Sequence, residues 1–265
     1  MTERLITSLT NDTVKAVRAL HMRKERETTG TFLAEGLKFI GEALDQGRAP
    51  RMLLVGQDAR PHPLLDRARA ETLKAGGEIV VVTHAILEKI SRRDNPQTVL
   101  GVFDQAYAPL EALNPDSAPC WVALEQVRDP GNLGTIIRTA DAAGCGGVIL
   151  IGDCVDPYSV EAVRATMGSV FAVSITRTDA DAFLAWRKTW PGSVVGTRLD
   201  ATVSHRTAVM RRPSLILMGN EQAGLTDRLA AACDVNVKIP MRGRADSLNL
   251  AIATGVMVYA ATDDL

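Results

Sequence analysis

The stretch DPGNLGTIIR (129–138) places an asparagine and an arginine just beyond a predicted strand, CWVALEQV (120–127). Glycines between a strand and a helix let backbone N–H groups approach an anion, so this junction is a candidate binding site. It is not a P-loop, because no Gly-Lys-Ser/Thr sequence follows. The glycine spacing also differs from the G-x-G-x-x-G fingerprint of dinucleotide-binding proteins, which argues against a nucleotide-dependent oxidoreductase.

A helix is predicted over residues 132–143, because apolar residues recur there at spacings of three and four. Asn132 is the expected N-cap of this helix, and Gly144 is expected just beyond its last turn. Arg138 lies off the apolar face. Spacing alone leaves two interpretations of Arg138 open: a solvated surface arginine, or an arginine that faces a ligand beside the strand end.

A second polar turn interrupts LILMGNEQAGLTDRL (215–229), where a buried strand is predicted to end at Gly219 and a helix to begin near Gly224. Glycine permits close approach of the backbone at both positions. Glu221 lies in the turn, where its carboxylate can cap the N-terminus of the following helix. The alternative is that Glu221 borders a cationic or hydroxyl-rich ligand.

The third stretch, IPMRGRADSLNLAIATGVMVYA (239–260), combines a polar loop with a helix that is apolar nearly all round. Such a helix is normally buried in a core or in an oligomer interface. Asp246 or Ser247 is the expected N-cap. Asn249 is a polar amide in the first turn, and burying it unpaired costs about 1–3 kcal/mol. We therefore expect Asn249 to bond a neighbouring loop or a ligand.

Strands and helices are predicted to alternate along the chain, which is typical of α/β proteins. Strands are predicted at residues 31–36, 51–56, 78–83, 98–103, 120–127, 146–152, 192–197, 214–219 and 235–240. Helices are predicted at residues 36–47, 62–75, 84–91, 132–143, 157–167, 179–189, 224–232 and 248–261. The later strands are nearly uniformly apolar, which suits a parallel sheet covered on both faces. Ligands of such sheets bind outside the carboxyl ends of the strands.

The composition is that of a soluble enzyme or binding protein. The chain has 265 residues, is 46% hydrophobic and 23% charged, and carries a net charge of −1, so no strong global field attracts it to nucleic acid. The four cysteines and four histidines show no metal-ligand spacing, so reduced thiols and no metal site are expected. No apolar run is long enough for a membrane span and the N-terminus lacks a signal peptide, so a cytoplasmic location is expected.

The three stretches, in this order and spacing, resemble the three motifs of the SpoU/TrmH family of RNA ribose 2′-O-methyltransferases, within the SPOUT superfamily. VEAVRATMGSVF (160–171) is similar to a fourth stretch usually found between the first two. The resemblance covers about residues 118–262. The first hundred residues resemble the ribosomal-protein-like substrate-binding domain that often precedes this catalytic domain.

The resemblance implies an α/β fold with a small α/β substrate-binding domain at residues 1–106 and a SPOUT catalytic domain at 118–265. The linker at 107–117 lies within a proline-containing stretch, 104–119, which favours a domain boundary. The catalytic domain is expected to hold a mostly parallel sheet and a deep C-terminal trefoil knot that binds S-adenosylmethionine. A homodimer through this domain is also implied.

The resemblance assigns the catalytic work to Arg138, with Asn132, Ser247 and Asn249 orienting it or the ribose, and Glu221 lining the pocket. The role that the resemblance implies for this arginine is that of a general base, assisted by an RNA phosphate. A guanidinium is not normally deprotonated in proteins, so our interpretation is that Arg138 binds a phosphate beside the target ribose and stabilises the developing alkoxide. The implied cofactor contacts are Thr197, Gly219, Asn220, Glu221, Gly224, Ile239, Met241 and Leu248.

RNA contacts are expected first in the opening helix, where basic side chains cluster, although a solvated helix face is the alternative. Further contacts are expected near the active site. The expected RNA-binding residues are Lys15, Arg18, Arg23, Lys24, Arg26, Arg164, Arg242 and Arg244. Ribosomal RNA of the large subunit is the favoured substrate because of the accessory domain. Transfer RNA is the first alternative, and a non-catalytic RNA-binding module of the same fold is the second.

Overall fold

The computed structural model describes residues 3–262 and divides into two compact units. The first unit contains the described residues up to Gln105 together with Tyr158–Ala172. The second contains Ala106–Pro157 and the described residues from Val173 onward. The expected domain limits at residues 1 and 265 lie outside the described residues.

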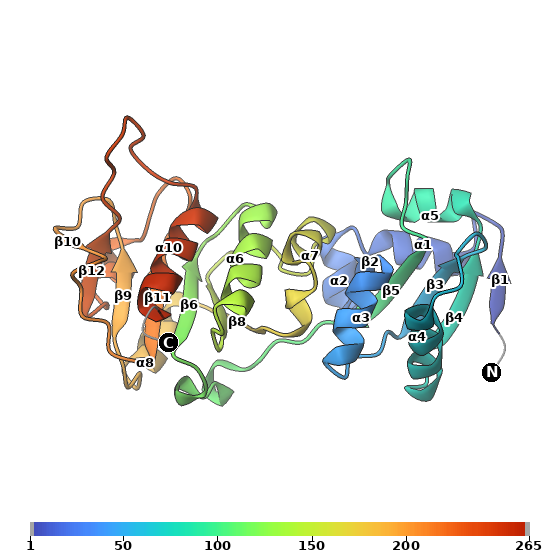
Figure 1. Ribbon diagram of the computed structural model, residues 1–265, viewed down its shortest axis with the longest axis horizontal. Helices are drawn as coiled ribbons and strands as arrows, with labels where there is room; N and C mark the ends of the chain where they lie inside the picture. Colours follow the sequence, from blue (N-terminus) through green and yellow to red (C-terminus); the bar gives the residue numbers. More distant parts are fainter. Residues whose placement is uncertain (1–2, 263–265) are drawn as a thin grey trace. The chain divides into compact units, whose positions relative to one another are not determined.

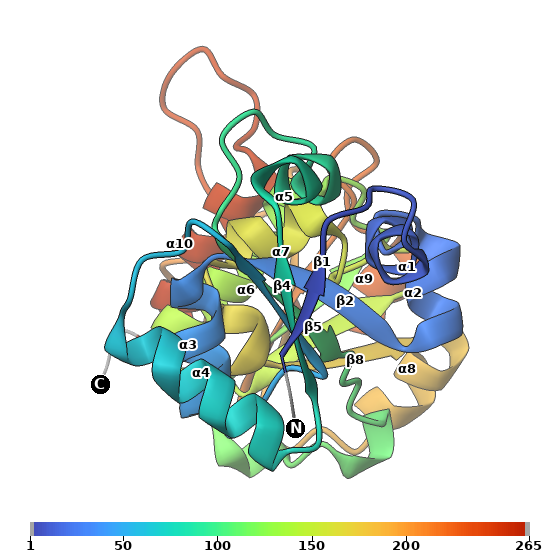
Figure 2. The same ribbon diagram turned by 90° about the vertical axis from the view of Figure 1, so that its right-hand side faces the viewer.

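The first unit holds a five-stranded mixed sheet in the order β1-β4-β3-β5-β2. Its strands are β1 (Arg4–Ile6), β2 (Thr31–Glu35), β3 (Met52–Gly56), β4 (Glu78–Val82) and β5 (Val99–Asp104). Strands β1, β4 and β3 are parallel, whereas β5 is antiparallel to both β3 and β2. Its helices are α1 (Asp12–Ala19), α2 (Arg23–Thr29), α3 (Leu37–Asp45), α4 (Pro63–Lys74), α5 (His84–Ser91), α7 (Val160–Thr166) and the short η3 (Ser169–Phe171). Helices α3 and α4 lie on one face of this sheet, and α1 and α2 lie on the other (Figure 2).

Helix α7 and η3 pack into the first unit, although they lie between two strands of the second unit in sequence. The rings of Tyr158 and Phe171 lie 4.6 Å and 5.7 Å from the ring of Phe32 on β2. Arg164 on α7 pairs with Glu35 at the end of β2, at 2.7 Å. The segment therefore completes the core of the first unit with aromatic and charged contacts.

The second unit holds a seven-stranded sheet in the order β10-β12-β9-β11-β6-β7-β8, in which every pairing is parallel. Its strands are β6 (Cys120–Glu125), β7 (Gly147–Ile151), β8 (Ser174–Thr178), β9 (Val194–Thr197), β10 (Val203–Ser204), β11 (Ser214–Met218) and β12 (Val235–Lys238). Its helices are α6 (Pro130–Ala142), α8 (Ala180–Arg187), α9 (Asp227–Ala230), α10 (Leu250–Thr262) and the short η1 (Leu110–Ala112) and η2 (Pro115–Ser117). Helices α6 and α10 pack side by side on one face of the sheet (Figure 1).

The parallel sheet was expected, and its topology positions the site. Strand β11 is central, with β9 on one side and β6 on the other. Because these strands are parallel, their carboxyl ends lie at one edge of the sheet, where ligands of open α/β sheets bind. The knotted path of the chain stays a prediction.

The nine predicted strands are confirmed within a residue or two, and three short strands escaped prediction. Strand β1 has three residues and β10 has two, too few for an alternating pattern to show. Strand β8 reads SITRT, and its polar residues fit a sheet edge rather than a buried strand.

Two helix predictions were wrong in detail. The opening basic helix is two helices, α1 and α2, because the chain turns at residues 20–22. The helix predicted at 224–232 shrinks to α9, since the residues before it fold into a turn and Thr226 becomes its N-cap.

Candidate active site at the carboxyl edge of the parallel sheet

A pocket of about 290 Å³ lies at the carboxyl ends of β9, β11 and β12 and at the start of α10. Its lining includes every residue expected to contact the cofactor, namely Thr197, Gly219, Asn220, Glu221, Gly224, Ile239, Met241 and Leu248. Ser247, expected near the reacting groups, also lines it, whereas Arg138, Asn132 and Asn249 do not. Binding pockets for small ligands typically span about 300–1,000 Å³, so this pocket lies just below that range.

The pocket wall requires glycine at position 219. A Cβ atom there would lie 2.0 Å from the carbonyl carbon of Gly224 and 2.0 Å from the nitrogen of Leu225. The two ends of the turn are held by paired backbone bonds between Asn220 and Gly224, at 3.0 Å and 2.9 Å. Gly224 has a φ of +71°, which favours glycine there as well.

The Asn220 side chain holds the turn itself. Its carbonyl oxygen accepts the N–H groups of Gln222 and Ala223, and its amide donates to the carbonyl of Gln126 at 2.8 Å. Both polar ends of Asn220 are therefore bonded within the protein. A cofactor contact of Asn220, which the sequence predicts, can come through its backbone, its carbon atoms or the second N–H group of its amide.

Glu221 does not cap the helix that follows it. Its carboxylate accepts the backbone N–H groups of Arg128 at 3.1 Å and Asp129 at 3.1 Å, which lead into α6. Burial alone would raise the pKa of Glu221, but these N–H donors, that of Glu221 itself and the Asn132 amide lower it. The carboxylate is therefore a fixed anion at the beginning of a different helix, where the helix dipole also favours it.

The N-caps of α6 and α10 differ from those that the sequence suggested. Asp129, not Asn132, is the N-cap of α6, because its carboxylate accepts the Asn132 N–H at 2.6 Å. Asn249, not Asp246 or Ser247, caps α10 by accepting the N–H of Ala251 at 2.9 Å. Because Asn132 does not cap the helix, its side-chain amide is available to donate to the Glu221 carboxylate, at 3.3 Å.

The Asn249 amide donates to the Asn132 side-chain oxygen at 2.8 Å. Asn249 is exposed, which differs from the buried position expected of it. It bonds its own helix and a side chain of α6, rather than the backbone of a loop. A chain of side-chain hydrogen bonds thus runs from Asn249 through Asn132 to Glu221 and joins all three sequence motifs.

Arg138 is exposed on α6. Among residues 3–262 its guanidinium has neither a hydrogen bond nor an ion pair, so all its donors are available to a ligand. The next residue, Thr139, lies 3.7 Å from where a Cβ atom on Gly255 of α10 would be. Arg138 therefore lies on α6 near its contact with α10, further from the starts of the two helices than Asn132 and Asn249.

The loop 240–249 carries further polar side chains. Ser247 donates its hydroxyl to Asp246 at 2.9 Å. Arg242 and Arg244 are exposed and have no partner in the described part of the chain. These two guanidinium groups are free to meet phosphates.

The basic residues of the first unit separate into free, paired and buried groups. The side chains of Arg18 and Lys24 have no partner among the residues that the structure describes, whereas Lys15 pairs with Asp12 and Arg23 with Glu27. Arg26 is only 3% exposed and donates to the carbonyl of Leu20 at 2.7 Å, so burial contradicts its expected contact with phosphate.

Arg164 is also bonded within the protein. Its guanidinium donates to both carboxylate oxygens of Glu35 and to the carbonyl of Ser91. These bonds lie inside the first unit and hold the guanidinium to the fold, and the expected contact of Arg164 with RNA stays a prediction.

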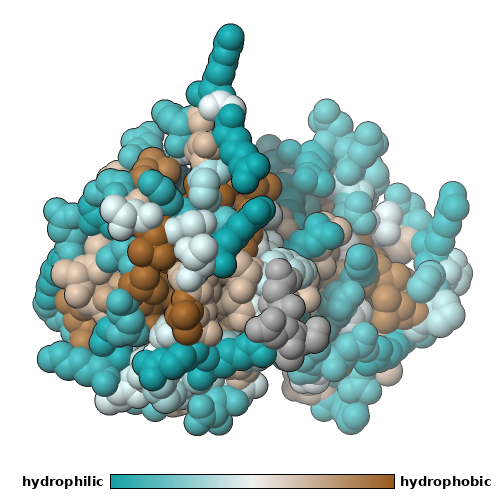
Figure 3. All heavy atoms as spheres, turned by 60° about the vertical axis from the view of Figure 1, so that its left-hand side comes forward, coloured by the Kyte–Doolittle hydropathy of each residue, from teal (hydrophilic) through white to brown (hydrophobic). Residues whose placement is uncertain are grey.

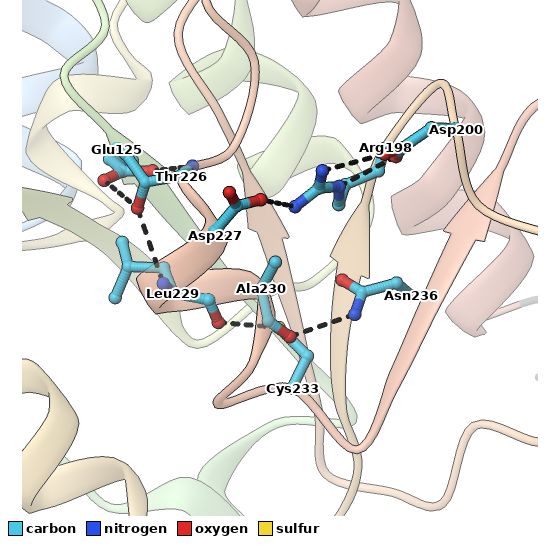
Figure 4. A network of polar contacts seen from close by, with 9 residues as sticks. All are labelled: Glu125, Arg198, Asp200, Thr226, Asp227, Leu229, Ala230, Cys233 and Asn236. Atoms are coloured by element: carbon cyan, nitrogen blue, oxygen red, sulfur yellow. Dashed lines mark hydrogen bonds and ion pairs between the residues drawn. The ribbon is translucent and has the colours of Figure 1, made fainter.

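Two polar residues near the pocket were missed in the sequence. Glu125 ends β6 and is 5% exposed, and it accepts the N–H and the hydroxyl of Thr226, both at 2.8 Å. Arg198 lines the pocket and pairs with Asp200 and with Asp227 at the start of α9 (Figure 4). The signal for Glu125 was a charged residue ending an apolar strand, LE after CWVA, which a buried strand tolerates only if the charge is satisfied.

The chain matches two family models in succession. Residues 119–259 match the SpoU rRNA Methylase family, and residues 11–101 match the MRM3-like substrate binding domain. The 23S rRNA (guanosine(2553)-2′-O)-methyltransferase RlmP of Bacillus subtilis is 31% identical over 254 residues, which are 96% of this chain and 97% of that protein.

Solved structures agree over nearly the whole chain. The AdoMet-bound rRNA methyltransferase from Sinorhizobium meliloti has a TM-score of 0.93 at 48% identity, and the match covers 99% of this chain and 98% of that one. The SpoU methyltransferase AviRb from Streptomyces viridochromogenes, in complex with AdoMet, has a TM-score of 0.85 at 28% identity, and the match covers 96% of this chain and 98% of that one.

The fold and site define an S-adenosylmethionine-dependent methyltransferase of the SPOUT type, preceded in the sequence by a substrate-binding domain. The chain belongs to the SpoU rRNA Methylase family. Its pocket fits this cofactor on internal grounds, because the hydroxyl of Thr197 is buried in the lining without a hydrogen-bond partner. Ile239, Met241 and Leu248 give the pocket apolar walls, which are compatible with an adenine ring.

Proposed function

We propose that the protein transfers a methyl group from S-adenosylmethionine to a ribose 2′-hydroxyl of large-subunit ribosomal RNA. The observation that carries this proposal is the series of side-chain hydrogen bonds from Asn249 through Asn132 to Glu221. It joins the pocket to α6, the helix that carries the unpaired Arg138. The names of RlmP and of the Streptomyces viridochromogenes 23S rRNA (uridine(2479)-2′-O)-methyltransferase support the reaction and the RNA class. Transfer RNA remains the alternative substrate.

S-adenosylmethionine supplies an electrophilic methyl group together with its own leaving group. The protein has to align the ribose hydroxyl with that methyl group and to stabilise the charge that develops on oxygen. Arg138 does this by binding the phosphate beside the target ribose with one edge of its guanidinium and the developing alkoxide with another. Because a guanidinium stays protonated, its role is to hold charge, and the proton of the ribose hydroxyl passes to the phosphate that Arg138 binds or to water as the new C–O bond forms.

Asn132 and Asn249 act on the geometry of this site. Each of them has one polar atom bonded to the other, so neither amide can rotate independently. Glu221 lines the pocket and accepts a hydrogen bond from Asn132, and Ser247 lines the same pocket. We assign the two asparagines and Ser247 to orientation of the ribose, and Glu221 to the rigidity of the pocket.

RNA is held by cations that have no competing side-chain partner among the described residues, and all of them except the half-buried Arg18 are exposed. On the first unit these are Arg18 and Lys24, and on the second they are Arg242 and Arg244. Lys15 and Arg23 join them, because exposed ion pairs contribute little stability and can exchange for phosphate contacts. Aromatic residues make up only 4% of the chain, so we assign recognition to RNA shape and backbone rather than to base stacking.

A homodimer through the second unit accounts for its exposed apolar side chains. On and just before α10, Leu248, Ile252 and Tyr259 are 39%, 56% and 48% exposed. Hydrophobic side chains lie at the surface of this unit, among hydrophilic ones (Figure 3). Sedimentation equilibrium tests the dimer, and Ile252→Asp is expected to shift the protein toward monomer if α10 forms the interface.

Within the described residues, no helix is long and apolar enough to cross a membrane. We place the enzyme in the cytoplasm, where ribosomal RNA is modified in bacteria.

Mapping of ribose methylation in RNA from cells with and without the gene tests the proposed function. A single 2′-O-methyl group lost from large-subunit RNA is the expected result, restored by the wild-type gene and not by the Arg138→Ala variant. Loss of a methyl group from transfer RNA instead would identify the alternative substrate. An unchanged map, together with S-adenosylmethionine binding by the purified protein, would contradict the proposed reaction on RNA.

A further inference from the structure

Two loops beside the pocket are joined by two carboxylates, and each loop supplies one carboxylate that accepts hydrogen bonds from the other loop. The turn after β11 sends Glu221 to the N–H groups of Arg128 and Asp129, in the loop after β6. In the opposite direction, β6 ends in Glu125, which accepts the N–H and the hydroxyl of Thr226, at the far end of the same turn. The two segments are thus fastened to each other at both ends.

Of these two carboxylates, that of Glu125 is the more buried. Glu125 is 5% exposed, and each of its carboxylate oxygens has its own donor on Thr226, at 2.8 Å (Figure 4). The Thr226 hydroxyl also accepts the N–H of Leu229 at 3.4 Å, so it links the carboxylate to the N-terminus of α9. Hydrogen bonds to a carboxylate are roughly twice as strong as neutral ones, and a buried carboxylate needs them.

Thr226 is two residues from Gly224, which forms part of the pocket wall. Gly224 and Leu225 in turn approach the backbone of Gly219 so closely that no Cβ atom fits between them. A shift of Thr226 away from Glu125 must therefore displace the segment that closes the pocket on this side.

We propose that Glu125 is a positioning residue for S-adenosylmethionine binding, acting through Thr226. It touches neither the pocket nor the reacting groups, and it lies outside the residues assigned above to cofactor, catalysis or RNA. Its carboxylate sets the position of residues 224–226 relative to β6, and so the width of the pocket in the absence of ligand. The role concerns cofactor binding and is independent of which RNA is methylated.

The test compares Glu125→Gln and Thr226→Val with Thr226→Ser, using calorimetric binding of S-adenosylmethionine to the otherwise intact protein. A glutamine sets an N–H₂ group against one of the two donors of Thr226, and a valine removes the hydroxyl donor, whereas a serine keeps it. We expect about tenfold weaker binding in the first two variants and binding within about twofold of wild type in Thr226→Ser. In methylation assays the same variants should raise KM for the cofactor more than they lower kcat.

Thr72→Val is the matched control, since it removes a buried threonine hydroxyl bond to Ala68 at 2.6 Å in the first unit. It should lower the unfolding temperature and leave cofactor affinity unchanged. Wild-type affinity in Glu125→Gln, or equal losses of affinity in Thr72→Val and Thr226→Val, would overturn the proposal. If Glu125→Gln does not fold, the Val and Ser variants of Thr226 decide it: equal affinity in those two would also overturn the proposal.

Discussion

The side-chain amide of Asn249 donates to the side-chain oxygen of Asn132, with 2.8 Å between the two atoms. The bond joins the first residues of α10 to the first turn of α6, and Asn132 passes the connection on to Glu221. Three segments that are far apart in sequence therefore meet through side chains whose donors and acceptors are matched. The beginning of α10 cannot move without changing the partner of Asn132.

Asn249→Asp is predicted to separate the two tasks of this residue. An aspartate still accepts the Ala251 N–H as an N-cap, but it has no amide to donate to Asn132. We expect stability close to wild type and a fall in kcat of about tenfold or more, because the ribose-orienting amides lose their fixed geometry. Thermal unfolding and single-turnover methylation measure the two effects. Wild-type kcat in this variant would contradict the assigned orientation role.

The Asn132→Ala and Asn249→Ala variants should be strongly non-additive. Side chains in direct contact show coupling energies of about 0.5–3 kcal/mol in double-mutant cycles. The double variant is therefore expected to be little worse in kcat than either single one. Additive losses would mean that the two amides act separately.

Arg138→Lys is predicted to retain measurable methylation, because an ammonium group can still hold a phosphate as a point charge. Arg138→Ala should lose about 100-fold to 1,000-fold in kcat, as expected when a donor to a developing oxyanion is removed. RNA affinity measured by filter binding separates the contributions. Complete loss of methylation in Arg138→Lys, with intact RNA binding, would favour a role for the guanidinium in the proton transfer itself.

The sequence predicted the strands and the residues around the pocket well, because both depend on local patterns. Buried parallel strands are apolar runs, and glycines and polar residues mark the loops at their ends. The caps were mistaken because several polar residues follow one another at each helix start, and only the three-dimensional partner decides which one caps. Asp129 and Asn132 are both favourable N-cap residue types, and Pro130 at the first helical position indicates the earlier start.

The place of residues 158–172 could not be predicted from sequence. Their helical pattern was visible, but nothing local indicates that the helix packs on β2, more than a hundred residues earlier. The same is true of Arg26, whose charge suggested an exposed surface and whose burial depends on the Leu20 carbonyl in the turn between α1 and α2. Long-range partners of charged residues are set by the tertiary fold.

Gly219→Ala is predicted to abolish binding of S-adenosylmethionine, whereas Gly224→Ala is predicted to weaken it only moderately. A Cβ atom on Gly219 meets backbone atoms at 2.0 Å, which no side-chain rotation can relieve. At Gly224 a Cβ atom has nothing within 4 Å, so the change only forces a non-glycine residue to a φ of +71°, at about 1 kcal/mol. Calorimetric titration of both variants checks the difference, and similar affinities in the two would contradict it.

Acid is predicted to remove the stabilising contribution of Glu221. Its pKa is lowered in the folded state from its ordinary value of 4.5, so the ionised carboxylate favours folding above about that pH. The contribution is lost as the pH falls through the lowered, folded-state pKa. In Glu221→Gln this part of the pH dependence is absent, so the difference in free energy of unfolding between the two proteins should shrink below pH 4.5. Urea unfolding from pH 7 to pH 3 measures it, and a constant difference would contradict the prediction.

Arg164→Met is predicted to destabilise the protein by about 3–5 kcal/mol, because it leaves the carboxylate of Glu35 buried without its partner. The side chain of Glu35 is 3% exposed and that of Arg164 is 27% exposed, so water cannot replace the guanidinium fully. Urea unfolding of this variant and of the double variant Arg164→Met/Glu35→Leu provides the comparison. The double variant should recover most of the loss, since two apolar side chains leave no buried charge.

The same variants distinguish a fold role of Arg164 from an RNA role. If Arg164 serves only the first unit, RNA affinity at a temperature where the protein is folded should remain within about twofold of wild type in the double variant, with no change in its salt dependence. A phosphate contact would instead lower the affinity and reduce the slope of its logarithm against the logarithm of salt by about one. Because Arg164 already donates to Glu35 and to the Ser91 carbonyl, we expect the first result.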